Sequence, residues 1–170
     1  VGRQLASLAE QTLRPHELVL CDDGSTDDTL AIAADFQRQA PFPVKIHRNA
    51  TRLGYSDNFL HGCSLATGEL IAFCDQDDVW LPAKLERCIR ALGSDGVVLA
   101  LHSADVVDAA LRPLGFTKPG FGASAVLPPH GGGLDFSQPG FAMVFAAGLV
   151  RAFDWRRRAR DFMRTDRPPM

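Results

Sequence analysis

Hydrophobic positions along the first hundred residues follow a helical period in some stretches and form short runs in others. Apolar residues recur every three or four positions in residues 2–12, 28–39, 56–66 and 83–92, which predicts four amphipathic helices. Short apolar or alternating segments at residues 17–21, 44–47, 70–74 and 97–101 predict four strands. Helices and strands are therefore expected to alternate along the chain.

This alternation favours an α/β fold, with a mainly parallel sheet that has helices on both faces. Residues 105–108 and 111–115 add a small antiparallel hairpin, and residues 140–145 form a further strand or a strand entering a helix. Residues 116–139 are rich in Gly and Pro and are expected to form a mobile loop. A first strand before residue 1 is missing, so we interpret the chain as a fragment of a larger protein.

Composition bounds the class of protein. A chain of 170 residues with 46% hydrophobic residues is typical of one globular domain with a real core. The net charge of −2 gives no basic footprint for nucleic acid. No stretch approaches the roughly 20 apolar residues of a membrane span. The four cysteines are widely separated and form no CxxC pair, which indicates neither a zinc site nor a disulfide framework, and fits a reducing cytoplasm.

Three carboxylates follow the apolar run of residues 70–74 within four positions. Asp75, Asp77 and Asp78 would repel one another at the tip of a buried strand, and a divalent cation among them would relieve that repulsion. Carboxylate oxygens are hard ligands, and Mg²⁺ commonly takes one or two of them together with substrate phosphates. The alternative is that Asp78 caps the next helix and that Asp75 and Asp77 are solvated loop residues.

A second pair of acids, Asp22 and Asp23, follows the apolar run that ends at Cys21. In a parallel sheet the carboxyl ends of both strands lie at one edge, so we expect the two acidic tips to converge on a ligand site there. These carboxylates could accept hydrogen bonds from ribose hydroxyls and base N–H groups. The alternative is turn chemistry, because Asp-Asp-Gly-Ser is also a good turn sequence.

Three motifs occur in a characteristic order. They are Asp-Asp-Gly-Ser-Thr-Asp from residue 22, Leu-Gly-Tyr-Ser-Asp-Asn-Phe from residue 53, and Ala-Thr-Gly-Glu-Leu-Ile-Ala-Phe-Cys-Asp-Gln-Asp-Asp-Val-Trp-Leu-Pro-Ala-Lys-Leu from residue 66. Together they resemble the family-two inverting glycosyltransferases of the GT-A fold, a Rossmann-like α/β fold. They are most similar to the bacterial polysaccharide branch, which includes rhamnosyltransferase-like enzymes. The resemblance is close over residues 3–92 and looser over residues 140–145.

The resemblance implies roles for individual residues. Asp23 should contact the nucleotide base, with Asp22 beside it. Asp75 and Asp77 match the Asp-x-Asp metal motif, so Asp77 would coordinate Mg²⁺ or Mn²⁺ and Asp75 would lie near the ribose and the metal. Asp78 is expected to cap the following helix.

The segment that flanks the nucleotide should supply Gly54, Tyr55 and Asn58. Many relatives carry Arg where this chain has Asp57, which leaves Arg52 as a substitute basic residue. In the family the catalytic base follows the segment that corresponds to residues 140–145. The acids of this chain beyond that segment lie in no convincing motif, and we expect the base beyond Met170; these acids are Asp154, Asp161 and Asp166.

The resemblance implies one partial GT-A domain over residues 1–170. Residues 1–95 would bind the nucleotide sugar, and residues 96–170 would form the acceptor side. The implied activity is metal-dependent transfer of a sugar, with inversion, from a UDP- or dTDP-linked donor to a saccharide or lipid-linked acceptor in surface polysaccharide or cell-wall synthesis. The implied location is the cytoplasm, with peripheral contact to the inner face of the membrane through the basic segment Arg151–Arg167.

Two other functions stay open. A sugar-phosphate nucleotidyltransferase would need a Gly-rich basic loop after its first strand, whereas the loop after Cys21 is acidic. A non-catalytic module that binds nucleotide sugars would keep the acidic tips without the base. Among single residues, His102 follows a strand at the same sheet edge and could approach the site, while Trp80 is expected to pack rather than stack on sugar.

Overall fold

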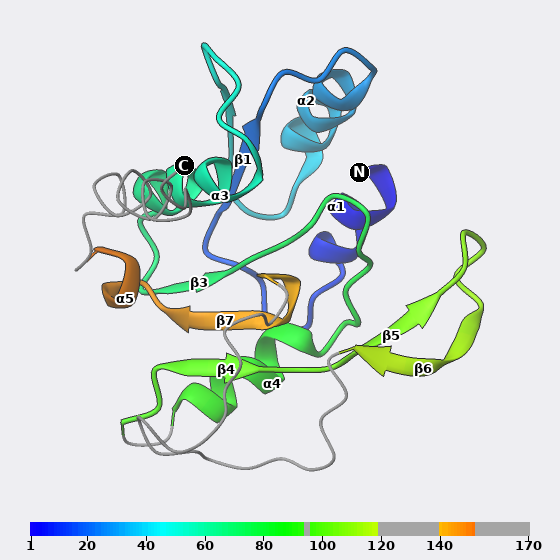
Figure 1. Ribbon diagram of the computed structural model, residues 1–170, viewed down its shortest axis with the longest axis vertical. Helices are drawn as coiled ribbons and strands as arrows, with labels where there is room; N and C mark the ends of the chain where they lie inside the picture. The colour runs from blue at the N-terminus through cyan, green and yellow to red at the C-terminus, as the bar shows by residue number, and fades with distance from the viewer. Residues whose placement is uncertain (94–95, 119–139, 152–170) are drawn as a thin grey trace, which may run out of the picture. The chain divides into compact units, whose positions relative to one another are not determined.

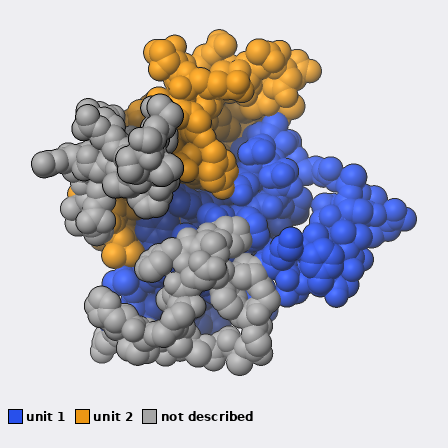
Figure 2. Space-filling model, in the orientation of Figure 1, with its two compact units in different colours: residues 1–15, 72–145 blue, residues 16–71, 146–170 orange. Residues whose placement is uncertain are grey.

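The computed structural model describes residues 1–93, 96–118 and 140–151. The chain divides into two compact units, which are coloured in Figure 2. The first unit comprises Val1–Pro15 and Ala72–Phe145, and the second unit comprises His16–Ile71 and Ala146–Met170. Each unit is described below by itself.

The second unit is built around two parallel strands, β1 (Leu18–Asp22) and β2 (Val44–Arg48). Their register pairs Leu18 with Val44 and Asp22 with Arg48. Helix α2 (Thr29–Gln39) connects the two strands, and α3 (Tyr55–Leu65) lies against β1 (Figure 1). This strand–helix–strand order brings the carboxyl ends of β1 and β2 to the same edge.

Small side chains allow the layers of the second unit to approach closely. Ala33 of α2 is 1% exposed. A Cβ on Gly62 of α3 would lie 3.5 Å from the Sγ of Cys21, so α3 lies directly over the end of β1. Close packing at this point fixes the start of α3 relative to the loop that follows β1.

The first unit contains helices α1 (Gly2–Ala9) and α4 (Lys84–Leu92), and strands β4 (Leu99–Leu101), β5 (Ala104–Val107) and β6 (Pro113–Lys118). Strands β5 and β6 form an antiparallel hairpin (Figure 1). Its turn is held by Asp108, whose carboxylate accepts hydrogen bonds from the backbone N–H groups of Ala110 and Arg112, both at 2.9 Å. These bonds and the Arg112 guanidinium lower the pKa of Asp108.

A three-stranded sheet has the order β3 (Leu70–Ala72), β7 (Met143–Ala146) and β4. Strand β7 follows a 3₁₀ turn (Gly140–Ala142) and leads into the short helix α5 (Gly148–Arg151). Strands β4 and β7 are antiparallel, and Ala100 pairs with Val144. These two residues pack with Cys88 of α4 in a buried cluster.

The α/β class, the alternation of helices and strands, and the antiparallel hairpin are confirmed. In detail, the described strands form three small sheets rather than one, with one parallel pair in β1–β2 and antiparallel pairs in β4–β7 and β5–β6. Residues 116–118, which were expected in the loop, belong instead to β6. Residues 119–139 lie outside the described part of the chain.

Two further expectations concern cysteines and membrane spans. All four cysteines are free thiols, as their spacing predicted. Within residues 1–93, 96–118 and 140–151, none of the helices has the length and apolar character needed to span a bilayer. The predicted functional halves, 1–95 and 96–170, differ from the two compact units and stay a prediction.

Candidate functional site

Asp22 is the last residue of β1, and its side chain is almost completely buried. The carboxylate accepts hydrogen bonds from the backbone N–H of Gly24 at 3.3 Å and of Ser25 at 3.1 Å. Arg48, its register partner on β2, forms an ion pair with it at 3.7 Å. Asp22 therefore closes the turn after β1, which is the turn role considered for it in the sequence, while a contact with nucleotide stays a prediction.

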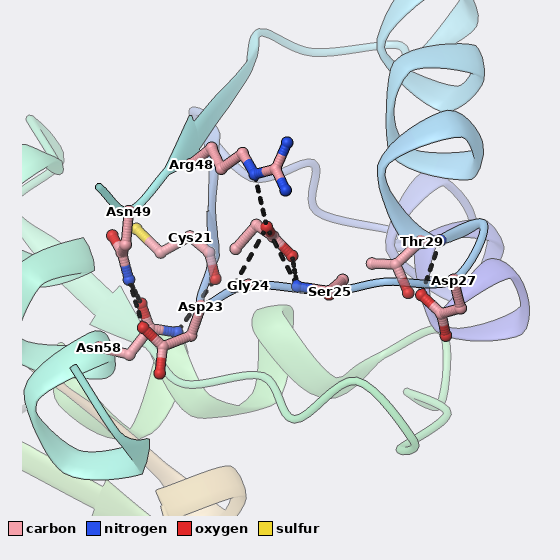
Figure 3. A network of polar contacts seen from close by, with 10 residues as sticks. Cys21, Asp23, Gly24, Ser25, Asp27, Thr29, Arg48, Asn49 and Asn58 are labelled. Carbon is pink, nitrogen blue, oxygen red and sulfur yellow. Dashed lines mark hydrogen bonds and ion pairs between the residues drawn. The ribbon is translucent and has the colours of Figure 1, made fainter. Parts of the chain in front are cut away.

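Asp23 lies beside Asn49 and Asn58, as Figure 3 shows. Its Oδ1 accepts hydrogen bonds from Asn49 Nδ2 at 2.8 Å and from the Leu53 backbone N–H at 2.7 Å. Its Oδ2 accepts one from the Gly54 backbone N–H at 2.8 Å. The hydrogen bonds from Leu53, Asn49 and Gly54 lower the pKa of Asp23, so this group is held as a carboxylate. A carboxylate offers about four acceptor positions, so one on Oδ2 is left for a ligand.

Asn58, in the first turns of α3, ties this helix to the end of β1. Its Nδ2 donates to the Cys21 carbonyl at 3.0 Å, and its Oδ1 accepts from Asn49 Nδ2 at 2.8 Å. Asn49 therefore bridges Asn58 and Asp23 (Figure 3). The second unit thus brings three of the predicted nucleotide residues, Asp23, Gly54 and Asn58, into one network.

Gly54 and Tyr55 form the entry to α3. Gly54 is the N-cap residue with φ of 84° and ψ of 170°, a conformation that is open essentially only to glycine. The Tyr55 side chain is 63% exposed and contacts the ring of Phe59 edge-on at 5.0 Å. The positive charge of Arg52 lies near enough to Asp23 to lower its pKa further. Arg52 is therefore a basic residue whose charge is coupled to this network.

The acidic turn, residues 75–78, comes after β3 in the chain. It belongs to the first unit. The Asp78 backbone N–H donates to the Asp75 carbonyl at 3.3 Å, which closes the turn. Asp77 is exposed, whereas Asp75 and Asp78 are partly buried. Burial raises the pKa of Asp78, and the like charges of Asp75 and Asp77 raise it further, while Lys84 opposes the shift. The three carboxylates are thus close enough to repel one another.

A divalent cation at the acidic turn would need ligand oxygens to complete its coordination. Within the described residues, no group of three or more His, Cys, Asp or Glu side chains is arranged to hold a metal. Mg²⁺ and Mn²⁺ are often bound by one or two carboxylates with phosphate oxygens and water supplying the rest. Asp75 and Asp77 can supply those two carboxylates, and the assignment of the metal to them stays a prediction.

The expected role of Asp78 as a helix cap is wrong. Helix α4 begins at Lys84, and its N-cap residue is Ala83. The Ala83 side chain makes no capping hydrogen bond to the helix. The segment Leu81–Ala83 separates the acidic turn from the helix, and the Lys84 backbone N–H bonds back to the Leu81 carbonyl at 3.0 Å. Asp78 is therefore a member of the carboxylate cluster rather than part of α4.

Lys84 is a candidate functional residue that the sequence pattern did not single out. Its ammonium group lies 3.6 Å from the centre of the Trp80 ring and donates to the Phe141 carbonyl at 3.1 Å. Burial lowers the pKa of Lys84 to about 8, although the nearby thiols of Cys74 and Cys88 and the carboxylates of the acidic turn favour the charged form. A partly buried lysine that lies over an aromatic face and is coupled to Asp75 and Asp78 was not visible from its position in the sequence.

His102 follows β4, as predicted, and belongs to the same surroundings as Lys84. Its ring Nδ1 lies 3.1 Å from the Ser103 carbonyl, and its backbone N–H donates to the Ala142 carbonyl at 3.0 Å. Burial lowers the pKa of His102, and the charge of Lys84 lowers it further. Trp80 is 6% exposed, so the expectation that it packs rather than presents its face to solvent is confirmed.

The two groups of predicted site residues lie in different units. Asp22, Asp23, Gly54, Tyr55 and Asn58 belong to the second unit, and Asp75 and Asp77 belong to the first. Their expected convergence at one edge stays a prediction. Asp154, Asp161 and Asp166, and the basic segment beyond Arg151, lie outside the described residues.

Comparison with known proteins identifies relatives for most of the chain. Residues 1–149 match the sequence profile of the family described as Glycosyl transferase family 2. An uncharacterized glycosyltransferase of Nostoc sp. is 38% identical over 108 residues, which are 64% of this chain and 33% of that protein. A UDP-Glc:alpha-D-GlcNAc-diphosphoundecaprenol beta-1,3-glucosyltransferase of Escherichia coli is 26% identical over 108 residues, which are 64% of this chain and 42% of that protein. The chain thus spans less than half the length of these relatives.

Two solved glycosyltransferase structures share the fold. TarS of S. aureus is similar with a TM-score of 0.70 and 22% identity, over 88% of this chain and 44% of that chain. A mannosyltransferase from Pyrobaculum calidifontis, in complex with GDP-Man and Mn²⁺, is similar with a TM-score of 0.53 and 23% identity, over 62% of this chain and 31% of that chain. TarS has also been solved in complex with UDP-GlcNAc. At these identities the likeness concerns the fold, and it agrees with the GT-A class expected from the motifs.

Proposed function

This chain belongs to glycosyl transferase family 2, and on that premise we propose that the whole protein is a metal-dependent inverting glycosyltransferase. It moves a sugar from a nucleoside-diphosphate donor to a hydroxyl group of a saccharide or lipid-linked acceptor. The product belongs to a surface polysaccharide or to the cell wall.

The acidic turn carries this proposal. Burial raises the pKa of Asp78, and the like charges of Asp75 and Asp77 raise it further. Asp77 is exposed to an incoming ligand. A cluster of like charges is unfavourable unless a cation joins it, and a nucleoside diphosphate would bring phosphate oxygens to complete that cation's coordination. Asp75 and Asp77 are proposed to hold Mg²⁺ or Mn²⁺ in this way.

The Asp23 network is proposed to hold the nucleoside. One acceptor position of Asp23 Oδ2 is available for a base N–H or a ribose hydroxyl, since Asn49, Leu53 and Gly54 occupy the others. A carboxylate held by three donors is pre-organised, so little is lost in ordering it when a ligand binds. Tyr55, with its exposed ring, is placed at the rim of this network.

The names of relatives support the ligand class. The E. coli relative uses UDP-Glc and an acceptor linked to diphosphoundecaprenol. The structural neighbours have been solved with UDP-GlcNAc and with GDP-Man and Mn²⁺. We therefore propose a UDP-linked donor first and a dTDP-linked donor second, with a saccharide or lipid-linked acceptor. Peripheral membrane contact through Arg151–Arg167 would suit a lipid-linked acceptor.

The proposed reaction is a single displacement at the anomeric carbon. The acceptor hydroxyl attacks that carbon from the face opposite the nucleoside diphosphate, which leaves with the bonding electrons, so the configuration inverts. A bound divalent cation would supply Lewis-acid stabilisation of the leaving diphosphate. Asp75 and Asp77 orient the donor, Asp23 fixes the nucleoside, and a general base, which we assign to none of the described residues, takes the hydroxyl proton.

Ligand-dependent stabilisation tests the proposal. UDP with Mn²⁺ at about 100 times its dissociation constant should stabilise the folded chain by about 2.7 kcal/mol, which is a rise of roughly 5–10 °C in Tm. The gain should need both components, and Asp77→Asn should remove its metal-dependent part. No gain with UDP or dTDP would overturn the proposal, and an unchanged gain in Asp77→Asn would overturn the metal assignment.

Product analysis separates the two alternatives. Sugar transfer from a nucleotide sugar to an acceptor by the whole protein distinguishes an enzyme from a non-catalytic module that binds the same donor. Formation of a nucleotide sugar from a nucleoside triphosphate and a sugar phosphate would identify a nucleotidyltransferase instead. The acidic character of the loop from Asp22 to Asp28 argues against triphosphate binding there.

A further inference from the structure

Helix α1 carries a row of polar side chains that are buried rather than exposed. Gln4, Ser7 and Gln11 are 7%, 4% and 4% exposed. Their spacing of three and four residues places them on one side of the helix, continued at Gln11 by the turn that follows it. Buried polar groups need hydrogen-bond partners, so the partners of this row show what α1 is built to hold.

The partners lie on both sides of the acidic turn. Gln4 Nε2 contacts Cys74 Sγ at 2.7 Å, directly before Asp75. The Trp80 backbone N–H donates to Ser7 Oγ at 3.0 Å, shortly after Asp78. Gln4 and Ser7 are themselves joined, because Ser7 Oγ donates to the Gln4 carbonyl at 2.7 Å. The row therefore brackets the acidic turn from a single rigid helix.

Gln11 extends this bracket to the start of α4. Its Nε2 donates to the Leu81 carbonyl at 2.9 Å, and its Oε1 accepts from the Leu85 backbone N–H at 3.2 Å. The N-cap residue Ala83 has no side chain that could satisfy the first N–H groups of α4. Gln11 thus replaces the cap that Asp78 does not provide.

We propose that the polar row Gln4–Ser7–Gln11 is a positioning element that fixes the acidic turn in the geometry required to bind a divalent cation with a nucleoside diphosphate. The inference rests on the proposed function. The row contacts neither ligand; it acts through the backbone at Trp80 and Leu81 and through the thiol of Cys74. Three adjacent carboxylates repel one another, so the turn they occupy needs restraint from outside to keep Asp75 and Asp77 in place.

The experiment measures binding of Mn²⁺ with UDP by calorimetry and by the electron paramagnetic resonance signal of free Mn²⁺. Ser7→Ala removes the acceptor for Trp80, and Gln4→Met keeps the side-chain length but removes the donor to Cys74. Each should weaken the affinity for Mn²⁺ with UDP about tenfold, the lower end of what supporting residues of metal sites contribute. Ser7→Thr keeps the hydroxyl group and should restore most of the affinity.

Two control variants separate positioning from general stability. Arg3→Met removes an α1 hydrogen bond that leads to Ala109 in the hairpin turn instead of the acidic turn. Val144→Ala removes a buried methyl pair from the cluster with Cys88 and Ala100, and lowers Tm without touching the row. Both controls should bind Mn²⁺ with UDP as the wild type does. Equal affinity in Ser7→Ala and the controls, at matched Tm, would overturn the inference.

Hydrogen exchange distinguishes failure of this inference from failure of the proposed function. Amides of residues 76–81 should exchange faster in Ser7→Ala than in Val144→Ala when both are compared at equal global stability. If the wild type does not bind Mn²⁺ with UDP, the proposed function fails, and faster exchange still identifies a row that holds the turn. If the wild type binds and exchange in residues 76–81 is unchanged by Ser7→Ala, the positioning role alone is wrong.

Discussion

The ammonium group of Lys84 lies 3.6 Å from the centre of the Trp80 indole ring and bonds to the Phe141 carbonyl. A cation over an aromatic face, out of water, is stabilised by the negative face of the ring. The same burial makes the charged form costly, and it lowers the pKa of Lys84 to about 8. Lys84 is thus a cation placed beside the acidic turn at an energetic cost.

The pH dependence of stability should report this cost. Between about pH 8 and 10.5, the ordinary pKa of a lysine, the unfolded chain keeps a proton on Lys84 that the folded chain has lost. Stability rises with pH wherever the unfolded state binds more protons. The free energy of unfolding of the wild type should therefore rise by on the order of 3 kcal/mol relative to that of Lys84→Met across that range. Urea unfolding at several pH values measures the difference.

Arginine at the same position provides the control. Lys84→Arg keeps a charge that does not titrate in this range. The difference in stability between the wild type and Lys84→Arg should therefore grow with pH in the same way. The difference in stability between Lys84→Met and Lys84→Arg should not grow with pH. A difference between wild type and Lys84→Met that is flat from pH 7.5 to 10.5 would contradict the lowered pKa.

Asp23 should be required for nucleotide binding. Asp23→Asn replaces one carboxylate oxygen with an N–H₂ group that faces donors, since Asn49, Leu53 and Gly54 all donate to this side chain. We expect the affinity for UDP to fall about tenfold or more, as a charge-assisted acceptor is lost and the loop before α3 is disturbed. Calorimetric titration of UDP measures the change.

Asp27 supplies the matched control for Asp23. It lies on the same loop, but its carboxylate bonds to Thr29 at the start of α2, which donates its backbone N–H at 3.1 Å and also bonds through its side chain. Asp27→Asn should therefore leave the affinity for UDP near that of the wild type. Equal losses in the two variants would mean that general loop charge, rather than the Asp23 network, determines binding.

Gly54 should tolerate no side chain, although it has space for one. A Cβ at this position would meet no atom within 4 Å, so the obstacle is the backbone φ of 84°. Adopting this conformation with alanine costs about 1–3 kcal/mol. Gly54→Ala should lower stability by this amount and weaken UDP binding, because the Gly54 N–H bonds to Asp23.

Gly148 shows what a glycine-to-alanine change does without this conformational demand. Its Cβ would also meet nothing within 4 Å, and it has no positive φ. It opens the short helix α5, where alanine is favoured over glycine. Gly148→Ala should be neutral or stabilising by thermal unfolding, and equal losses at both positions would contradict the account of Gly54.

Residue periodicity predicted the helices, the hairpin and both acidic tips, because each follows from local pattern. It could not predict the polar row of α1, since Gln4, Ser7 and Gln11 have the composition of a solvent-facing side. Their burial depends on a thiol and on backbone groups about 70 residues further along the chain. The error at Asp78 has the same origin: local capping rules do not register that Gln11 already serves the start of α4.

The surroundings of the charged residues could not be predicted from the sequence pattern either. Lys84 appears in the sequence as an ordinary first-turn residue of an amphipathic helix, and its burial against Trp80 is a property of the tertiary fold. Asp22 and Asp23 are adjacent and chemically identical, but one is buried in a turn and the other faces the loop before α3. The two side chains differ only in the direction in which each leaves the end of β1.

Glu17 should make the second unit sensitive to acid. Its side chain is 7% exposed, bonds to the Lys45 ammonium at 2.6 Å, and accepts hydrogen bonds from the backbone N–H and hydroxyl of Thr67. Burial alone would raise the pKa of Glu17, but the bonds from Lys45 and Thr67 outweigh it and lower the pKa to about 2. The carboxylate thus joins the start of β1 to β2 and to the residues after α3.

The sign of the effect follows from the lowered pKa. Above pH 4.5, the ordinary pKa of a glutamate, both states carry the charge, so the full stabilisation is present; it is lost as the pH falls through the range from 4.5 to about 2. The stability difference between wild type and Glu17→Gln should therefore shrink across that range in urea unfolding. Glu86→Gln, which removes an exposed pair with Arg90, should change stability by less than about 1 kcal/mol at pH 7. A difference for Glu17→Gln that persists unchanged to pH 2 would show that the carboxylate charge is not what holds β1, β2 and Thr67 together.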